Sequence, residues 1–127
     1  MTNRPPENDS LSVLVVEDEF LLALDLQHTL EEAGYRVMGP ARKVAEAIGL
    51  LKANAPDVAI LDVNLLGERV TPVARLLTAM GVPFVLSTAD DEFARSDEAL
   101  SASENLGKPI NHKRMLTSLR ALTTLQS

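Results

Sequence analysis

Short, mostly aliphatic runs alternate along the chain with longer segments in which apolar residues recur at helical spacing. Runs that are hydrophobic almost throughout are typical of strands buried on both faces of a sheet. The predicted strands are residues 11–16, residues 35–38, Val58–Leu61, Phe84–Leu86 and a short fifth strand around residues 105–106.

Helical periodicity fills the intervals between these runs. Leu22, Leu26 and Leu30 mark the first helix, and Gly34 follows it as a C-terminal cap. Thr71 and Asn111 are the predicted N-caps of two later helices. The predicted helices cover about residues 19–33, from 44 to before 56, 71–80 and 111–122, with a weak or partly irregular helix over 89–103.

Strands that alternate with single helices predict βα units, in which a parallel sheet is covered on both faces. About five such units in one small domain indicate an α/β, flavodoxin-like, doubly wound fold with a five-stranded parallel sheet and about five helices. In such sheets ligands bind beyond the carboxyl ends of the strands. The residues at those ends are therefore the candidate functional residues.

Composition narrows the class of protein. A chain of 127 residues is long enough for one domain, which we place at residues 11–125, after a short disordered arm at residues 1–10. The absence of cysteine excludes disulfides and thiolate chemistry, and the net charge of -6 argues against nucleic acid as a partner. No signal peptide and no membrane span are evident, so we expect a cytoplasmic protein.

Charged and hydroxyl side chains follow the predicted strands directly. Glu17 and Asp18 follow the first strand, Asp62 the third, Thr88 comes just after the fourth, and Lys108 lies beyond the fifth. Three carboxylates at one sheet edge form the oxygen-rich site that Mg²⁺ prefers, and a lysine with a hydroxyl suits an anion. This combination indicates phosphoryl transfer to a carboxylate, and Asp62, alone at its strand end, is the nucleophile candidate.

The stretches "VLVVEDE", "AILDVNL", "VLSTA" and "GKP", in this order, resemble the receiver domain of bacterial two-component response regulators. The resemblance covers nearly the whole chain. It implies that Asp62 is the phosphoacceptor and that the phosphoryl group comes from a histidine kinase or a histidine phosphotransfer protein. It further implies that Asp18, Asp62 and the backbone carbonyl of Asn64 ligate Mg²⁺, with Glu17 acting directly or through water.

The same resemblance assigns the remaining polar residues. Thr88 would bond a phosphoryl oxygen, Lys108 would pair with the phosphoryl group, and the Lys108-Pro109 peptide would be cis. Asn64 would either orient the water that hydrolyses the acyl phosphate or be a plain loop residue. Glu19 is expected to stabilise the start of the first helix as an acidic residue near its N-terminus.

A finer likeness lies in "DVNLLGERVTPVARLLTAMGVPFVLSTAD", which resembles the single-domain receivers of the alphaproteobacterial FAT GUY group. Those proteins typically carry Thr-Gly-Tyr where this chain has Thr88, Ala89 and Asp90. In the wider family an aromatic switch residue occupies the position of Asn105. We therefore expect a readout of phosphorylation that differs from the usual threonine-to-aromatic coupling.

Phe20 and Leu24 fall on a different face of the first helix from its core leucines. One interpretation is an apolar docking patch for the kinase or phosphotransfer protein, and the other is a wide core stripe with Phe20 partly buried. His28 and His112 have no metal-ligand companion in the pattern and are interpreted as surface residues.

The sequence thus predicts a single-domain response regulator that uses Mg²⁺, accepts a phosphoryl group on Asp62 and then switches a protein contact or serves as a phosphate sink. We expect no enzyme activity beyond its own phosphorylation and dephosphorylation. One alternative is a binding module that kept the fold but is not phosphorylated. A weaker one is an aspartyl-phosphate phosphatase, which typically needs a second acid where this chain has Asn64.

Overall fold

A parallel sheet of four strands forms the centre of the computed structural model, which describes residues 11–126. The predicted N-terminal arm lies outside these residues. The strand order is β2-β1-β3-β6, with β1 at Ser12–Val16, β2 at Arg36–Ala41, β3 at Val58–Leu61 and β6 at Phe84–Leu86. Strands β1, β3 and β6 are buried throughout, as their hydrophobic sequences predict.

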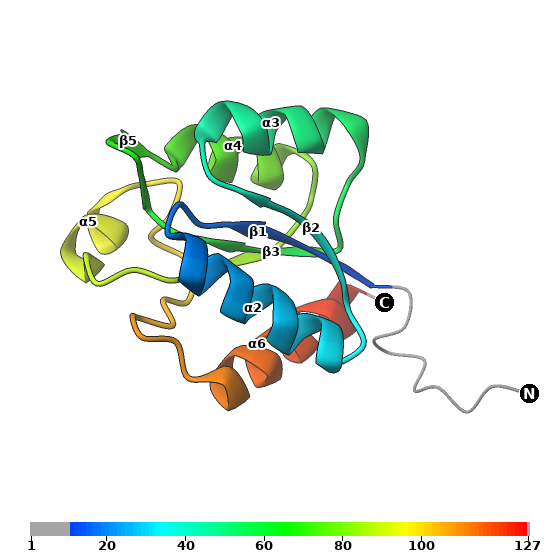
Figure 1. The fold of residues 1–127 in the computed structure, drawn as a ribbon. Helices are drawn as coiled ribbons and strands as arrows, with labels where there is room; N and C mark the ends of the chain where they lie inside the picture. The colour runs from blue at the N-terminus through cyan, green and yellow to red at the C-terminus, as the bar shows by residue number, and fades with distance from the viewer. Residues whose placement is uncertain (1–10, 127) are drawn as a thin grey trace, which may run out of the picture.

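Helices cover both faces of the sheet (Figure 1). Helices α2 (Phe20–Glu32) and α6 (His112–Gln126) lie on one face, and α3 (Val44–Ala53) and α4 (Thr71–Ala79) lie on the other. Side chains of β1 alternate between the two cores: Val13 packs with Leu26 and Met115, whereas Leu14 packs on the side of Leu51 and Leu77. The predicted doubly wound α/β fold is confirmed, and among the described residues no helix is long and apolar enough to cross a membrane.

The predicted fifth strand is reduced to one parallel bridge between Leu86 and Asn105. Leu86 N–H donates to Glu104 O and Leu106 N–H donates to Leu86 O, both at 2.8 Å. The chain then turns away, because Gly107 adopts a positive φ of 78° and donates its N–H to the Asn105 side chain. The next ladder groups on the neighbouring strand side, the N–H and carbonyl of Thr88, bond to the Asn105 side chain instead.

Of the three predicted helix caps, Gly34 and Asn111 are confirmed and Thr71 is not. Gly34, with φ of 98°, follows α2, and Asn111 Oδ1 accepts the N–H of Arg114 at the start of α6. The prediction for Thr71 was wrong, because the N-cap of α4 is Val70. The Thr71 hydroxyl instead donates to Asp97 Oδ2 at 2.7 Å, a partner that lies far along the chain.

A small antiparallel hairpin, β4 (Asn64–Leu65) and β5 (Glu68–Arg69), follows Asp62 and was not predicted. Leu66 and Gly67 form its two-residue turn with φ of 48° and 88°. Leucine is an unusual residue at positive φ, so the sequence carried only the glycine as a signal. The weak helix predicted over residues 89–103 is α5 (Asp91–Ser96), followed by turns.

Candidate functional site

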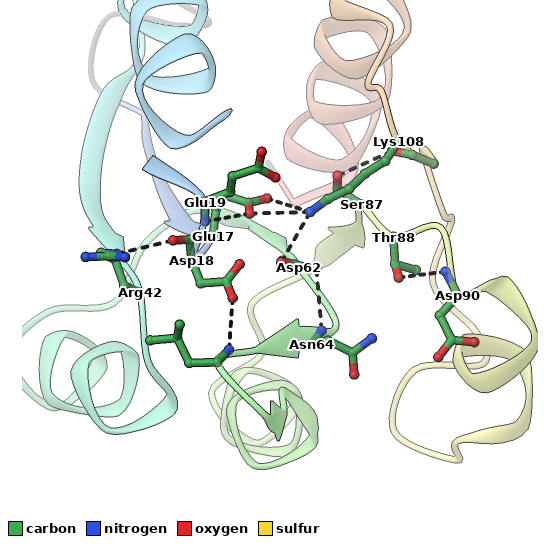
Figure 2. Close-up of polar contacts among 12 residues, drawn as sticks. Glu17, Asp18, Glu19, Arg42, Asp62, Asn64, Ser87, Thr88, Asp90 and Lys108 are labelled. Atoms are coloured by element: carbon green, nitrogen blue, oxygen red, sulfur yellow. Dashed lines mark hydrogen bonds and ion pairs between the residues drawn. The ribbon is translucent and has the colours of Figure 1, made fainter. Parts of the chain in front are cut away.

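The carboxyl ends of β1, β3 and β6 meet at one edge of the sheet (Figure 2). Val16 is paired with Leu61, and Asp62 N–H donates to Val16 O at 2.8 Å. This register places Glu17 and Asp62, the residues that follow the two strands, level with each other. The prediction that the residues at the strand ends converge is confirmed for these two acids.

Three carboxylates cluster at this edge. Glu17, Asp18 and Asp62 each have a carboxylate oxygen within 4.8 Å of the others. Glu17 and Asp62 are buried, while Asp18 is half-buried. Carboxylate oxygens are the ligands that Mg²⁺ prefers, and so many like charges at one place favour a bound cation. The donor set therefore fits the predicted metal.

Lys108 supplies a positive charge to this cluster. Its Nζ lies 3.2 Å from Glu17 Oε1 and 3.3 Å from Asp62 Oδ2, between the two buried acids in Figure 2. The Lys108-Pro109 peptide is cis, as the resemblance implied. One ammonium against three carboxylates leaves the cluster negative, which is a second reason to expect a cation there.

Burial and the neighbouring charges shift the pKa values of Asp62 and Lys108. Burial raises the pKa of Asp62 to about 7; the charge of Glu17 adds to the rise and Lys108 opposes it. Burial lowers the pKa of Lys108, but the charges of Asp62 and Glu17 outweigh burial and leave its pKa raised. Asp62 is thus a carboxylate whose protonation changes near neutral pH, while Lys108 stays charged.

Glu17 also organises the turn that leads into α2. Its Oε2 accepts the N–H of Glu19 at 3.0 Å. Glu19 stands at the N-cap of α2 and makes no capping hydrogen bond with its own side chain. The electrostatic role predicted for Glu19 needs no such bond and stays a prediction, while the hydrogen bond at this turn comes from Glu17 at the end of β1.

Asp18 connects the cluster to the hairpin. Its Oδ2 accepts the N–H of Leu66 at 2.9 Å, and its carbonyl accepts from Arg42 Nε at 3.2 Å. Burial acts to raise the pKa of Asp18, but hydrogen bonds, chiefly that from Leu66, leave it lowered. Asp18 is therefore held ionised, as a metal ligand must be.

Thr88 and Asn64 lie beside the cluster and make other contacts. The buried Thr88 hydroxyl accepts the N–H of Asp90 at 2.9 Å. The backbone N–H of Asn64 donates to Asp62 Oδ1 at 3.4 Å, whereas its side-chain oxygen accepts from Arg69 Nη1 at 2.8 Å. The roles predicted for these two side chains remain predictions.

Sequence reasoning missed Arg69. Its guanidinium lies 3.7 Å from the ring centroid of Phe93 and its Nη1 is 3.2 Å from Asp90 Oδ2. These contacts join the hairpin after Asp62 to the start of α5, where Asp90 caps the helix by accepting the N–H of Phe93. Only the acid-rich start of the 89–103 segment hinted at a basic partner.

The N-terminal part of α2 exposes three large apolar side chains. Phe20 is 66% exposed and Leu24 49%, and Leu21 between them is 72% exposed. The alternative of a wide core stripe with Phe20 partly buried is therefore wrong. Both histidines lie on the surface, as predicted, although His112 Nε2 lies 2.7 Å from Asp25 Oδ2.

The chain is similar to known proteins over most of its length. Residues 13–120 match the family model described as the response regulator receiver domain. The sensory transduction protein LytT of Bacillus anthracis is 32% identical over 113 residues, which are 87% of this chain and 46% of LytT. The chain thus spans about half the length of the curated relatives that it matches.

Solved structures extend the likeness. The solution structure of SdrG from Sphingomonas melonis Fr1 is 35% identical, with a TM-score of 0.77 over 91% of this chain and 98% of that chain. The BeF3-activated conformation of SdrG from Pseudomonas melonis Fr1 is 36% identical, with a TM-score of 0.72 over 88% of this chain and 95% of that chain. Because the family match extends over most of the sequence and includes Glu17, Asp62 and Lys108, this chain belongs to the response regulator receiver domain family.

Proposed function

We propose that this receiver accepts a phosphoryl group on Asp62. The observation that carries the proposal is the position of Asp62, which is buried at the end of β3 beside the carboxylate of Glu17 and the ammonium of Lys108. A carboxylate with a raised pKa is more basic than an exposed one, and once deprotonated it is a better nucleophile. Lys108 is placed to pair with an anion formed at Asp62.

The donor is a phosphohistidine on a histidine kinase or a histidine phosphotransfer protein. A carboxylate oxygen of Asp62 attacks phosphorus; the P–O bond forms while the P–N bond breaks, and the bonding electron pair leaves with the imidazole nitrogen. Lys108 pairs with the phosphoryl oxygens, and Thr88 donates its hydroxyl proton to one of them. Water, oriented by Asn64, later attacks the phosphorus of the acyl phosphate; the P–O bond to Asp62 breaks, its electron pair returns to the Asp62 carboxylate, and inorganic phosphate leaves.

Asp18, Asp62 and the backbone carbonyl of Asn64 would hold Mg²⁺, with Glu17 bound directly or through water. Mg²⁺ at this position neutralises negative charge on the transferred phosphoryl oxygens. Lys108 contacts both carboxylate oxygens of Glu17, at 3.2 and 3.3 Å, and Oε1 keeps a further lone pair for the metal or for its water.

The output is a changed protein contact or a phosphate sink in the cytoplasm, with no reaction on a separate substrate. Action as a single-domain receiver remains a prediction, since the likeness covers 98% of SdrG but only 46% of LytT. Membership of the FAT GUY group remains a prediction. A phosphatase is disfavoured by Asn64, which offers no second acid, and an unphosphorylated module is disfavoured by the complete set of Asp18, Asp62 and Lys108 at the site.

Mass spectrometry with Mg²⁺ and acetyl phosphate as the phosphodonor tests the central proposal. We expect one phosphoryl adduct on the wild-type chain and none on Asp62→Asn, which keeps the size of the side chain but not its nucleophilic charge. Asp57→Asn is the matched control, because Asp57 lies at the opposite end of β3 and should leave the adduct unchanged. An adduct that persists in Asp62→Asn would contradict the assignment.

The exposed patch of Phe20, Leu21 and Leu24 on α2 is the proposed docking surface for the kinase or phosphotransfer protein. Phe20→Asp should slow phosphotransfer from the protein donor by about tenfold or more, because a charge in an apolar contact remains unpaired. Labelling by acetyl phosphate should be unchanged. Equal loss with both donors would show a folding defect and remove the docking role.

A further inference from the structure

The side chain of Asn105 uses all of its hydrogen-bonding capacity on the Thr88–Asp91 loop and on its own turn at Gly107. Its Oδ1 accepts the N–H of Thr88 at 3.1 Å and the N–H of Gly107 at 2.9 Å. Its Nδ2 donates to the carbonyl of Thr88 and to Asp91 Oδ1, both at 3.1 Å. A carboxamide has two acceptor sites and two donors, so the described contacts leave none unused.

These contacts hold Thr88 from both sides of its backbone. Asn105 binds the N–H and the carbonyl of Thr88, so the residue can neither rotate nor shift without breaking two hydrogen bonds. Thr88 follows Ser87, whose N–H donates to Leu61 O at 2.8 Å, and the loop is therefore tied to β3 just before Asp62. The position of Thr88 relative to Asp62 thus depends on Asn105.

The same arrangement leaves the proton of the Thr88 hydroxyl available. Its Oγ1 accepts the N–H of Asp90, which uses one acceptor site of the hydroxyl. A hydroxyl has a single donor in addition to its acceptor sites. The contact with Asp90 therefore does not use the hydroxyl proton, which stays available for an anion.

We infer that Asn105 is a positioning residue for phosphoryl transfer, which holds Thr88 where its hydroxyl serves a phosphoryl group on Asp62. The inference rests on the proposed function of Asp62. It gives Asn105 a role through Thr88 alone, since its side chain makes no described contact with the acid cluster or with Lys108. Carboxamide chemistry is essential, because a carboxylate at this position would face the oxygens of Asp91 and Thr88.

Beryllofluoride with Mg²⁺ is the probe, since BeF3⁻ on a carboxylate stands in for a phosphoryl group. Its affinity is measured by NMR titration of the intact chain carrying Asn105→Ala, Asn105→Asp, Thr88→Ala or the double change Asn105→Ala with Thr88→Ala. Both Asn105 variants should bind BeF3⁻ about tenfold more weakly, the size expected for one hydrogen bond to a charged group. The affinity for Mg²⁺ alone should stay unchanged.

The double variant separates positioning from general stability. If Asn105 acts through the Thr88 hydroxyl, Asn105→Ala should have little further effect once Thr88 is alanine. Additive losses would overturn the inference, as would BeF3⁻ affinity that Asn105→Ala leaves unchanged. Amide hydrogen exchange gives a second readout: Thr88 and Gly107 should exchange at least about tenfold faster in Asn105→Ala, and unchanged exchange would equally overturn it.

Asn111→Ala is the matched control, because it removes a cap hydrogen bond made by the same type of side chain six residues further along. It should lower stability without changing the affinity for BeF3⁻; a weaker affinity there would ascribe the Asn105 effect to stability and overturn the inference. If the wild-type chain binds BeF3⁻ and the Asn105 effects are absent, only this inference fails. If the wild-type chain takes neither BeF3⁻ nor a phosphoryl group, the proposed function fails and the inference fails with it.

Discussion

Two neighbouring regions at the carboxyl edge of the sheet are held together in different ways. Glu17 and Asp62 extend from strands that are buried throughout and bonded by backbone ladders. Lys108 completes the cluster with a side chain that is only 23% exposed. The second region, residues 88–106, contains the six-residue helix α5. Ala94, Leu100 and Leu106 are buried there, but many of its other contacts are hydrogen bonds of exposed or half-buried side chains, among them Asp90 and Asn105.

The difference shows how a receiver can combine fixed chemistry with a movable surface. Deforming the first region would break ladder bonds and expose apolar side chains, which is costly. In the second region each polar contact near water contributes little, so a few can be exchanged at a small cost in free energy. Phosphorylation would therefore leave the acid cluster and the contacts between Asn105 and Thr88 in place and rearrange α5 and the turns that follow it.

The largest expected effect comes from breaking the first region at its ammonium. In metal-free protein at pH 8, Lys108→Ala leaves Glu17 and Asp62 buried without their cation, and the free energy of unfolding should fall by about 2–3 kcal/mol. Urea denaturation measures this change, and Mg²⁺ binding should be largely retained. Lys52→Ala, at the exposed end of α3, should change stability by less than about 0.5 kcal/mol. A loss no greater than that of the control would show that Lys108 does not hold the cluster together.

The second largest effect is expected in the pH dependence of Mg²⁺ binding to the acid cluster. Because burial raises the pKa of Asp62 to about 7, protons compete with Mg²⁺ below neutral pH. The dissociation constant for Mg²⁺ should be about tenfold larger at pH 6 than at pH 8 in calorimetric titrations, since one pH unit below the pKa leaves about a tenth of the carboxyl ionised. Asp62→Asn should bind Mg²⁺ more weakly and lose this dependence. A wild-type affinity that is constant from pH 6 to 8 would refute a titrating Asp62.

The same pKa fixes the sign of the stability change in metal-free protein. Asp62 titrates at about 7 in the folded chain against 3.8 for an ordinary carboxyl, so the folded state binds more protons between these values. Stability from this group is therefore full at the acidic end of that window and declines as pH rises through about 7.

The smallest effect on the whole molecule is expected from breaking the second region at Arg69. Arg69→Ala removes the contacts to Asn64, Asp90 and Phe93 but should barely change the midpoint of urea denaturation, because the guanidinium lies near water. Amide hydrogen exchange of residues 90–97 should become several-fold faster, while amides of β3 stay protected. Arg75→Ala, an exposed arginine of α4, is the control and should leave both unchanged. A large fall in stability without faster local exchange would show that Arg69 belongs to the rigid region. The proposed difference between the two regions would then be wrong.

Most of the fold could be predicted from local features of the sequence. The continuous aliphatic runs predicted β1, β3 and β6, and the 3.6-residue period predicted α2, α3, α4 and α6. The short α5 was predicted as a weak helix because few large apolar residues lie between Ala89 and Ser103. The Thr71 cap was misjudged because the Thr71 hydroxyl bonds to Asp97, a partner far along the chain. The fifth strand was misjudged because the chain turns at Gly107, whose N–H bonds to the Asn105 side chain.

The contacts at the candidate site likewise fall into those that the sequence predicts and those that it does not. Glu17, Asp18, Asp62 and Lys108 could be expected at one sheet edge from their places after the strands, since residues that follow parallel strands meet wherever such a sheet forms. The contacts of Arg69 with Asp90, of Thr71 with Asp97 and of Asn105 with Thr88 became visible only in the folded chain. These partners are 17 to 26 positions apart. A hydrogen bond tolerates only a few tenths of an ångström and a narrow range of angles, so such pairs depend on the packing of the whole molecule rather than on any local pattern.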